Sequence, residues 1–186
     1  MNREIEQSYI KRILGGDTNS FSYFVNTYSN AVFTLIVRVV QSREDAEELT
    51  QDTFLKAFSK LDGYRGDCSF STWLYRIAYN TAISSVRKVK VVLPAIDDYV
   101  INSVADNEVD ILFANDENEL LLQKMETAIE QLPPEEKALI TLFYLQNKPI
   151  AEIAEILQFT VENIKVKLHR TRKKLYVMIQ NDHRYE

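Results

Sequence analysis

The side chains best suited to bind a flat, charged ligand gather in one short segment of the chain. Gly63 and Gly66 allow close backbone approach, Tyr64 and Phe70 offer rings for stacking, and Arg65 adds a positive charge. An unpaired nucleic-acid base suits this combination, because every base has a face that stacks on aromatic rings. The segment therefore predicts a loop that can hold a base outside a double helix.

A second segment of this kind is a run of positive charge near the C-terminus. Apolar residues at helical spacing predict a short helix over 150–157, a tight turn and a second helix capped by Thr160, which is a helix-turn-helix pattern. Residues 163–180 hold six basic side chains and no acidic one: Lys165, Lys167, Arg170, Arg172, Lys173 and Lys174. We expect base-edge contacts from the first turns of the second helix, at Glu162, Asn163, Lys165, Val166 and Lys167, and phosphate contacts from Arg170 and Arg172. An ordinary solvated basic face is the competing interpretation.

The overall charge argues at first against nucleic-acid binding, because the 186-residue chain carries a net charge of -5. The acidic residues are unevenly placed, however. Residues 91–123 hold eight of them and no Lys or Arg, so the rest of the chain has a net charge of +3. The basic helix is therefore a plausible electrostatic footprint for DNA.

Long helices are needed to position these segments. Only four Gly and four Pro occur, which is too few for the frequent turns of an all-β fold, and apolar stripes predict helices over about 21–39, 43–61 and from Phe70 onward. Ser42 is placed as an N-cap. Gln158 stands in the turn of the helix-turn-helix, where a positive φ would favour glycine. We expect an all-α fold.

The second and third predicted helices carry polar faces opposite their apolar stripes. In the helix over 43–61, an acidic face can offer acceptors to basic groups on a partner, or can simply be solvated: Glu47, Glu48, Gln51 and Asp52. In the helix from Phe70, Trp73 belongs to the buried stripe, whereas Arg76, Tyr79 and Asn80 lie on other faces. We expect these three to contact single-stranded DNA or phosphate, with Arg87 extending the basic edge.

Catalytic and metal sites are not indicated. The single cysteine, Cys68, cannot form an internal disulfide or, alone, a thiolate zinc site, and His169 and His183 lack ligand partners at metal spacing. No export signal or membrane-length apolar run is present. We therefore expect a cytoplasmic protein that is not an enzyme and has no metal and no cofactor.

Three segments resemble bacterial RNA polymerase sigma factors of the extracytoplasmic-function (ECF) group, in the family's order. Residues 44–58 resemble the region 2 helix that docks on the polymerase clamp, residues 67–80 the reader of the minus-ten element, and residues 153–157 with 165–175 the region 4 reader of the minus-thirty-five element. The resemblance implies core RNA polymerase and promoter DNA as partners, and an anti-sigma factor that holds the protein inactive. It also implies that the loop from Tyr64 captures a flipped base.

The resemblance and the periodicity together predict two small helical domains. Residues 1–90 would form region 2, residues 91–118 an acidic linker where periodicity fades, and residues 119–186 region 4. As a flexible coil, the acidic spacer would keep the domains too close to reach both promoter elements, which lie roughly 85 Å apart along B-DNA. We expect polymerase binding to separate the domains, with the acidic spacer in the channel that nascent RNA would otherwise use.

Two other functions remain open from the sequence. The first is a helix-turn-helix transcription regulator that acts without being a polymerase subunit, for which the N-terminal half would be an unrelated sensor. The second is a helical adaptor or antagonist that binds only proteins, which would leave the basic helix without a role.

Overall fold

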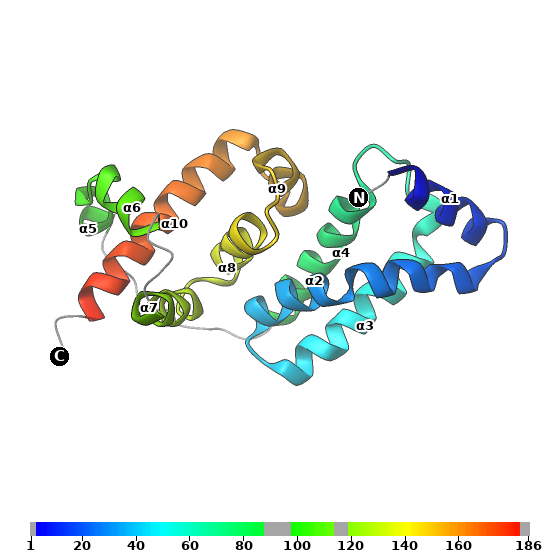
Figure 1. Ribbon diagram of the computed structural model, residues 1–186, viewed down its shortest axis with the longest axis horizontal. Helices are drawn as coiled ribbons and strands as arrows, with labels where there is room; N and C mark the ends of the chain where they lie inside the picture. Colours follow the sequence, from blue (N-terminus) through cyan, green and yellow to red (C-terminus); the bar gives the residue numbers. More distant parts are fainter. Residues whose placement is uncertain (1–2, 88–97, 114–118, 183–186) are drawn as a thin grey trace.

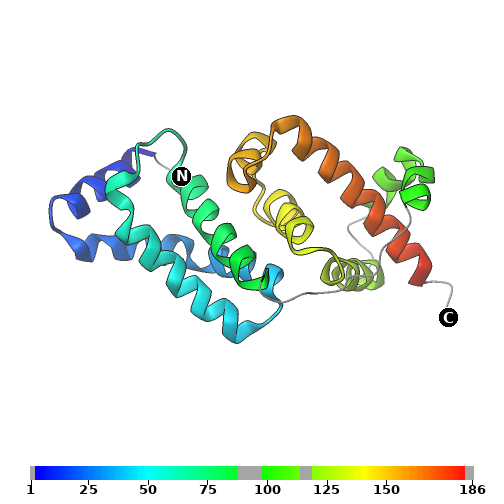
Figure 2. The ribbon, with the colours of Figure 1, turned by 180° about the vertical axis from the view of Figure 1, so that it is seen from behind.

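The computed structural model describes residues 3–87, 98–113 and 119–182, and all regular structure in these ranges is helical. The helices form two bundles that lie side by side (Figure 1), and the view from behind shows the same division (Figure 2). The predicted all-α fold is confirmed. None of the described helices is long and apolar enough to cross a bilayer.

The N-terminal bundle contains four α-helices and two short 3-10 turns. Its elements are α1 (Arg3–Leu14), η1 (Thr18–Phe21), α2 (Ser22–Val40), α3 (Arg43–Ser59), η2 (Leu61–Gly63) and α4 (Phe70–Val86). Helices α2, α3 and α4 pack on one another, with Phe24, Leu35 and Leu74 completely buried between them. Burying each such side chain contributes about 1.5–3 kcal/mol. The apolar stripes seen in the sequence are therefore the faces that hold this bundle together.

Local capping fixes where the helices of this bundle begin. The Ser42 hydroxyl accepts a hydrogen bond from the Asp45 amide at 3.2 Å, as predicted for an N-cap. Ser69 caps α4 in the same way, accepting from the Thr72 amide at 3.1 Å. Because Ser69 ends the preceding loop, this cap also fixes where the loop meets α4.

The C-terminal bundle holds the helix-turn-helix. Its elements are α5 (Asp98–Ser103), α6 (Asp106–Phe113), α7 (Glu119–Glu130), α8 (Pro134–Ile140), the π-helical turn η3 (Thr141–Leu145), α9 (Ile150–Leu157) and α10 (Val161–Asp182). Gln158 lies in the left-handed region at φ 60°, ψ 43°, where the sequence predicted a position that favours glycine. The Thr160 hydroxyl accepts from the Asn163 amide at 3.2 Å. The predicted turn and cap are confirmed.

The acidic spacer departs from the expectation of a segment without helical periodicity. Within the described residues 98–113 it forms α5 and α6, and both helices pack against α10. Ile101 and Val109 are buried, as is Val177 of α10, so short apolar contacts support the two helices. Residues 91–97 and 114–118 of the spacer lie outside the described ranges.

The two bundles contact each other along α4. Helix α9 packs on α4, and α8 packs on both α2 and α4 (Figure 1). The Tyr75 hydroxyl donates to the Gln146 side-chain oxygen at 2.8 Å, and the Gln41 side-chain amide donates to the Glu130 carbonyl at 2.8 Å. Arg38 and Glu126 form a further ion pair across the junction. The expectation that the free protein holds its domains close together agrees with this arrangement.

Candidate nucleic-acid and polymerase interface

The loop between η2 and α4 borders a cavity. This cavity has a volume of about 400 Å³, within the range of small-ligand sites, and is lined by loop residues 63–68, Trp73 and Arg76 of α4, and Glu155 of α9. Gly66 has a φ of 77°, a left-handed conformation that glycine adopts without strain. The Tyr64 hydroxyl donates to the Cys68 carbonyl at 2.7 Å, and Arg3 of α1 donates to the Gly66 carbonyl at 2.7 Å. The loop is therefore held in shape before any ligand arrives.

Partial burial favours the neutral forms of Tyr64 and Cys68 in the loop. Burial raises the pKa of the Tyr64 phenol. Burial also raises the pKa of the Cys68 thiol, with the nearby Glu155 carboxylate adding to the effect. Since the thiolate is the reactive form of cysteine, this shift lowers the reactivity of Cys68. This agrees with a structural role for a small residue at this position.

Two residues expected to contact DNA are buried instead. Phe70 is 1% exposed, because the first turn of α4 is inserted into the core. Its ring packs against that of Phe24 in a tilted arrangement, with 4.0 Å between the ring centroids. Tyr79 is 5% exposed, and burial, with the charge of Glu135 adding, raises its pKa to about 12. Neither ring is accessible to DNA in this structure. This closed arrangement therefore gives no support to either assignment, and both stay predictions.

The remaining expected residues of this surface lie along α4 and its loop. Arg65, Asn80 and Arg87 are exposed, whereas Tyr64 and Arg76 are half-buried at the cavity. Arg87 at the end of α4 lies 3.9 Å from Glu135 of α8. Trp73 is 9% exposed and packs on Tyr64 at 5.2 Å between ring centroids, as expected for a core residue. Tyr64, Arg65 and Arg76 of the expected set therefore meet at the cavity.

The acidic face of α3 forms a second candidate surface. Glu47 accepts from Arg43 at 3.1 Å and Asp52 lies 3.6 Å from Lys56, while Glu48 and Gln51 are exposed without a salt bridge among the described residues. Leu55 lies on the same face, seven residues after Glu48, and is 67% exposed. Leu55 was not predicted as part of this surface. An apolar residue outside the buried stripe of the helix is the sequence feature that could have identified it.

The reading face of α10 is the third candidate surface. Glu162, Asn163, Lys165 and Val166 are exposed, and Val166 has 58% of its surface accessible. Lys167 is half-buried, with its ammonium 4.6 Å from the centre of the Phe159 ring and 3.9 Å from Glu135. Thr160 is occupied as the helix cap. Arg170 and Arg172 are each paired with an aspartate of α5 or α6.

Comparison with known proteins decides the family. The Sigma-70 region 2 family matches residues 24–91, and the Sigma-70 region 4 family matches residues 122–175. The ECF RNA polymerase sigma-E factor of Haemophilus influenzae is 31% identical over 182 residues, covering 94% of this chain and 95% of that protein. The chain belongs to the ECF sigma factors.

Further relatives agree with this assignment. The ECF RNA polymerase sigma factor SigW of Bacillus subtilis is 30% identical over 177 residues, covering 89% of this chain and 92% of that protein. Among solved structures, CnrH in complex with the cytosolic domain of CnrY matches with a TM-score of 0.65 and 18% identity, over 94% of this chain and 96% of that one. The sigma factor RpoE of Bartonella quintana, in complex with the anti-sigma factor NepR, matches with a TM-score of 0.63 and 21% identity, over 86% and 96%. These two structures confirm the sigma-factor fold.

Family membership makes this chain a sigma factor, a protein that joins core RNA polymerase and directs promoter recognition. The alternative of a regulator that acts without being a polymerase subunit is not favoured. Among the residues that the structure describes, no three His, Cys, Asp or Glu side chains are grouped so that they could hold a metal ion.

Proposed function

We propose that this ECF sigma factor reads two promoter elements through separate surfaces and opens the upstream edge of the transcription bubble without making or breaking a covalent bond. The observation that carries this proposal is the preformed loop cavity beside Arg76, in the same chain as a capped helix-turn-helix with an exposed reading face. A cavity of about 400 Å³ with Tyr64 and Trp73 in its wall suits a base rotated out of the duplex.

The division of labour follows from these surfaces. We assign residues 1–90 to polymerase binding and minus-ten recognition, residues 91–118 to the acidic linker, and residues 119–186 to minus-thirty-five recognition. For the minus-ten element we retain Tyr64, Arg65, Arg76, Asn80 and Arg87. For the minus-thirty-five element we retain Arg170 and Arg172 as phosphate contacts. The other predicted residues of this surface are also retained: Thr160, Glu162, Asn163, Lys165, Val166 and Lys167.

The acidic face of α3 would bind core polymerase. Glu47, Glu48, Gln51 and Asp52 supply acceptors for basic groups, and Leu55 adds an apolar centre that contact would remove from water. Exchanging Leu55 for Asp would weaken polymerase binding while leaving the fold intact, because Leu55 contributes little to the core. Removing the apolar surface of Leu55 from water would add to the binding free energy.

The cellular setting is proposed from the family. A sigma factor works where RNA polymerase works, so we place this one in the cytoplasm. An anti-sigma factor is the natural antagonist, since the structurally similar RpoE of Bartonella quintana was solved with the anti-sigma factor NepR.

Run-off transcription tests the proposal. Core polymerase with this protein should initiate selectively on a pool of random promoters and enrich two sequence elements. Core polymerase alone provides the baseline. Initiation that is no more selective than this baseline would refute the proposed function.

A further inference from the structure

The acidic helices α5 and α6 meet the basic helix α10 through matched charges. The Arg170 guanidinium lies 2.7 Å from Asp98, and the Arg172 guanidinium lies 2.8 Å from Asp110. Asp106 serves two partners, the Lys173 ammonium at 2.8 Å and the His169 ring nitrogen at 3.4 Å. Three carboxylates of the spacer thus face four basic side chains of one helix.

These four basic residues continue the face of α10 that carries the reading residues. Residues spaced by four, seven and eleven positions share one side of an α-helix, so Glu162, Val166, His169 and Lys173 form a single stripe. Arg170 and Arg172 flank this stripe on either side. Helices α5 and α6 lie against the C-terminal part of α10 and leave its first turns open (Figures 1 and 2). The acidic helices therefore cover the part of α10 that directly follows its exposed reading face.

The attachment of α5 and α6 is weak for its size. The side chains of Asp98, Asp106 and Asp110 are 72%, 68% and 68% exposed, whereas those of Arg170, Arg172 and Lys173 on α10 are 50%, 24% and 13% exposed. Ion pairs whose acidic members are this open to water contribute little to stability. Their fully buried apolar support is small: Ile101, Val109 and Val177 lie outside the main core cluster, and Leu112 and Phe113 of α6 pack against that cluster only while partly buried. Such an attachment can be displaced by a stronger anion.

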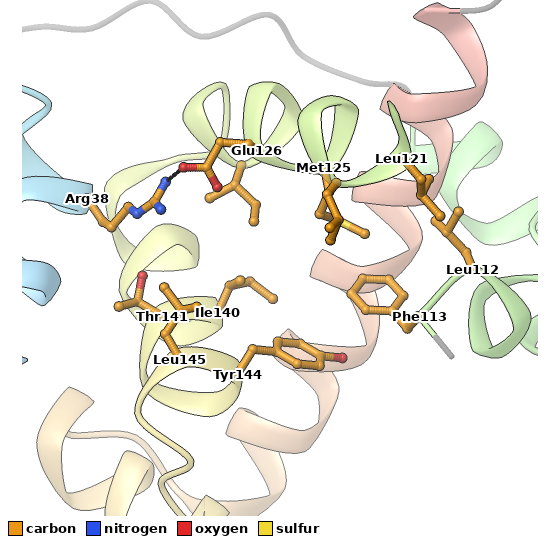
Figure 3. Close-up of a pocket in the computed structure, with 12 residues that line it drawn as sticks. Arg38, Leu112, Phe113, Leu121, Met125, Glu126, Ile140, Thr141, Tyr144 and Leu145 are labelled. Carbon is orange, nitrogen blue, oxygen red and sulfur yellow. Dashed lines mark hydrogen bonds and ion pairs between the residues drawn. The ribbon is translucent and has the colours of Figure 1, made fainter. Parts of the chain in front are cut away.

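Packing beneath α6 is also incomplete. A cavity of about 470 Å³ lies between α6, α7 and η3, with Phe113 and Leu112 of α6 on one side and Met125 and Tyr144 among the opposite walls (Figure 3). Phe113 stacks on Tyr144 at 5.4 Å between ring centroids, and the Arg172 guanidinium lies 4.7 Å from the centre of the Phe113 ring. A cavity withholds contacts that would otherwise fix a helix in place. Release of α6 therefore costs less than release of a well-packed helix.

We propose that His169, Arg170, Arg172 and Lys173 form one track for DNA backbone phosphates, and that α5 and α6 occupy this track in the free protein as an internal competitor of DNA. The inference rests on the proposed function of α10 as a DNA reader. It adds His169 and Lys173 to that surface, and it gives the acidic spacer a role before polymerase binds. Carboxylates and phosphate oxygens are both anionic acceptors, so one set of cations can hold either but not both.

The proposal makes a quantitative distinction in salt dependence. A cation that holds a carboxylate must first give up that ion pair, which salt weakens much as it weakens binding to phosphate. An occupied cation therefore contributes little to the slope of log affinity against log salt. Each freed cation that meets a phosphate adds about -0.9 to that slope. Uncovering the track should therefore make DNA binding both tighter at low salt and more sensitive to salt.

The test uses the full chain with Asp98→Asn, Asp106→Asn and Asp110→Asn combined, which keeps the side-chain shapes and removes the charges. Binding to a fluorescent random-sequence duplex about two helical turns long is measured against salt. The matched control combines Glu44→Gln, Asp45→Asn and Asp62→Asn, three exposed acids of the N-terminal bundle with the same change in net charge. We expect the first variant to bind about tenfold more tightly than the control, with a slope steeper by about 2 to 3. Equal affinities and slopes for the two variants would overturn the proposal.

A second measurement needs no variant. Hydrogen exchange of the wild-type protein should show faster exchange of the amides in 98–113 when the same duplex is added, because DNA displaces α5 and α6. Unchanged or slower exchange there, in the presence of bound duplex, would contradict displacement. Run-off transcription distinguishes failure of this inference from failure of the proposed function. Selective initiation together with negative binding and exchange results would refute only the internal competition by α5 and α6. Failure of selective initiation would refute the proposed function itself.

Discussion

The hydroxyl of Thr72 in α4 donates a hydrogen bond to the carboxylate of Glu152 in α9, with 2.8 Å between the oxygens. Lys148 reaches the same carboxylate at 2.9 Å and also the Ser71 hydroxyl at 2.9 Å. These contacts tie α4, the helix that follows the loop cavity, to the first helix of the helix-turn-helix. Two helices in contact cannot reach promoter elements roughly 85 Å apart, so we expect this junction to open on the promoter.

Removing the charge at this junction should favour the open arrangement. Glu152→Gln weakens the hydrogen bonds from Thr72 and Lys148, at a cost of about 1 kcal/mol, which raises the ratio of open to closed protein about fivefold. Small-angle X-ray scattering would detect the change as a larger radius of gyration. Glu119→Gln, an exposed acid of α7, serves as the control and should leave the radius unchanged. Equal radii for the two variants would show that Glu152 does not hold the junction.

Acid should open the same junction. Burial alone would raise the pKa of Glu152, but hydrogen bonds from Lys148 and Thr72 outweigh it and hold the pKa below the ordinary value of 4.5. A lowered pKa means that the closed form binds the proton less well than the open form. The contribution of Glu152 is therefore present above its ordinary pKa and is lost as the pH falls through the lowered one. Scattering against pH should show expansion in this range for the wild type and a smaller pH response for Glu152→Gln.

Lys137 of α8 should make the protein more stable at mildly alkaline pH. Its side chain is 3% exposed, and burial lowers its pKa to about 8. Because the unfolded chain holds this proton up to about pH 10.4, stability rises as the pH goes from 7 to 9, by about 1 kcal/mol for this group. Denaturant unfolding of Lys137→Met at both values should lack this increment and show higher stability at pH 7. A wild-type increment no larger than that of the variant would contradict the assignment.

The loop cavity predicts different outcomes for Arg76 and Phe70. Arg76→Ala leaves the core intact and should lower the formation of open promoter complexes about tenfold, because a group beside the displaced base is lost. Phe70→Ala should instead reduce the free energy of unfolding by about 3–5 kcal/mol, since it leaves a large cavity in the core. Permanganate footprinting and denaturant unfolding report the two effects. Lys60→Ala, an exposed basic residue away from the cavity, is the control and should change neither.

Local features were predictable from the sequence because their causes are local. The Ser42 cap, the helix from Ile150 to Leu157 and the left-handed Gln158 each follow from a few neighbouring side chains. The family resemblance supplied the order of the two reading units. None of these signals depends on how distant parts of the chain meet.

Burial at the junction was not predictable in the same way. Helix α4 is covered by α2 and α3 on one side and by α8 and α9 on another, so its buried surface is wider than one apolar stripe indicates. Tyr75 is buried for this reason, with its hydroxyl bonded to Gln146. The helices α5 and α6 were missed because they are short, and their apolar residues meet partners on α10 more than 60 positions away.

The position of Glu155 has a consequence for how this protein moves through a cell. Glu155 of α9 lines the loop cavity, so its carboxylate lies beside the place proposed for a displaced base. In the same way, aspartates of α5 and α6 form ion pairs with basic side chains of α10. A genome offers about 10⁶–10⁹ nonspecific sites, and a protein with bare basic surfaces would spend most of its time on them. With both surfaces screened, we expect the free molecule to remain available to polymerase rather than to be held by chromosomal DNA.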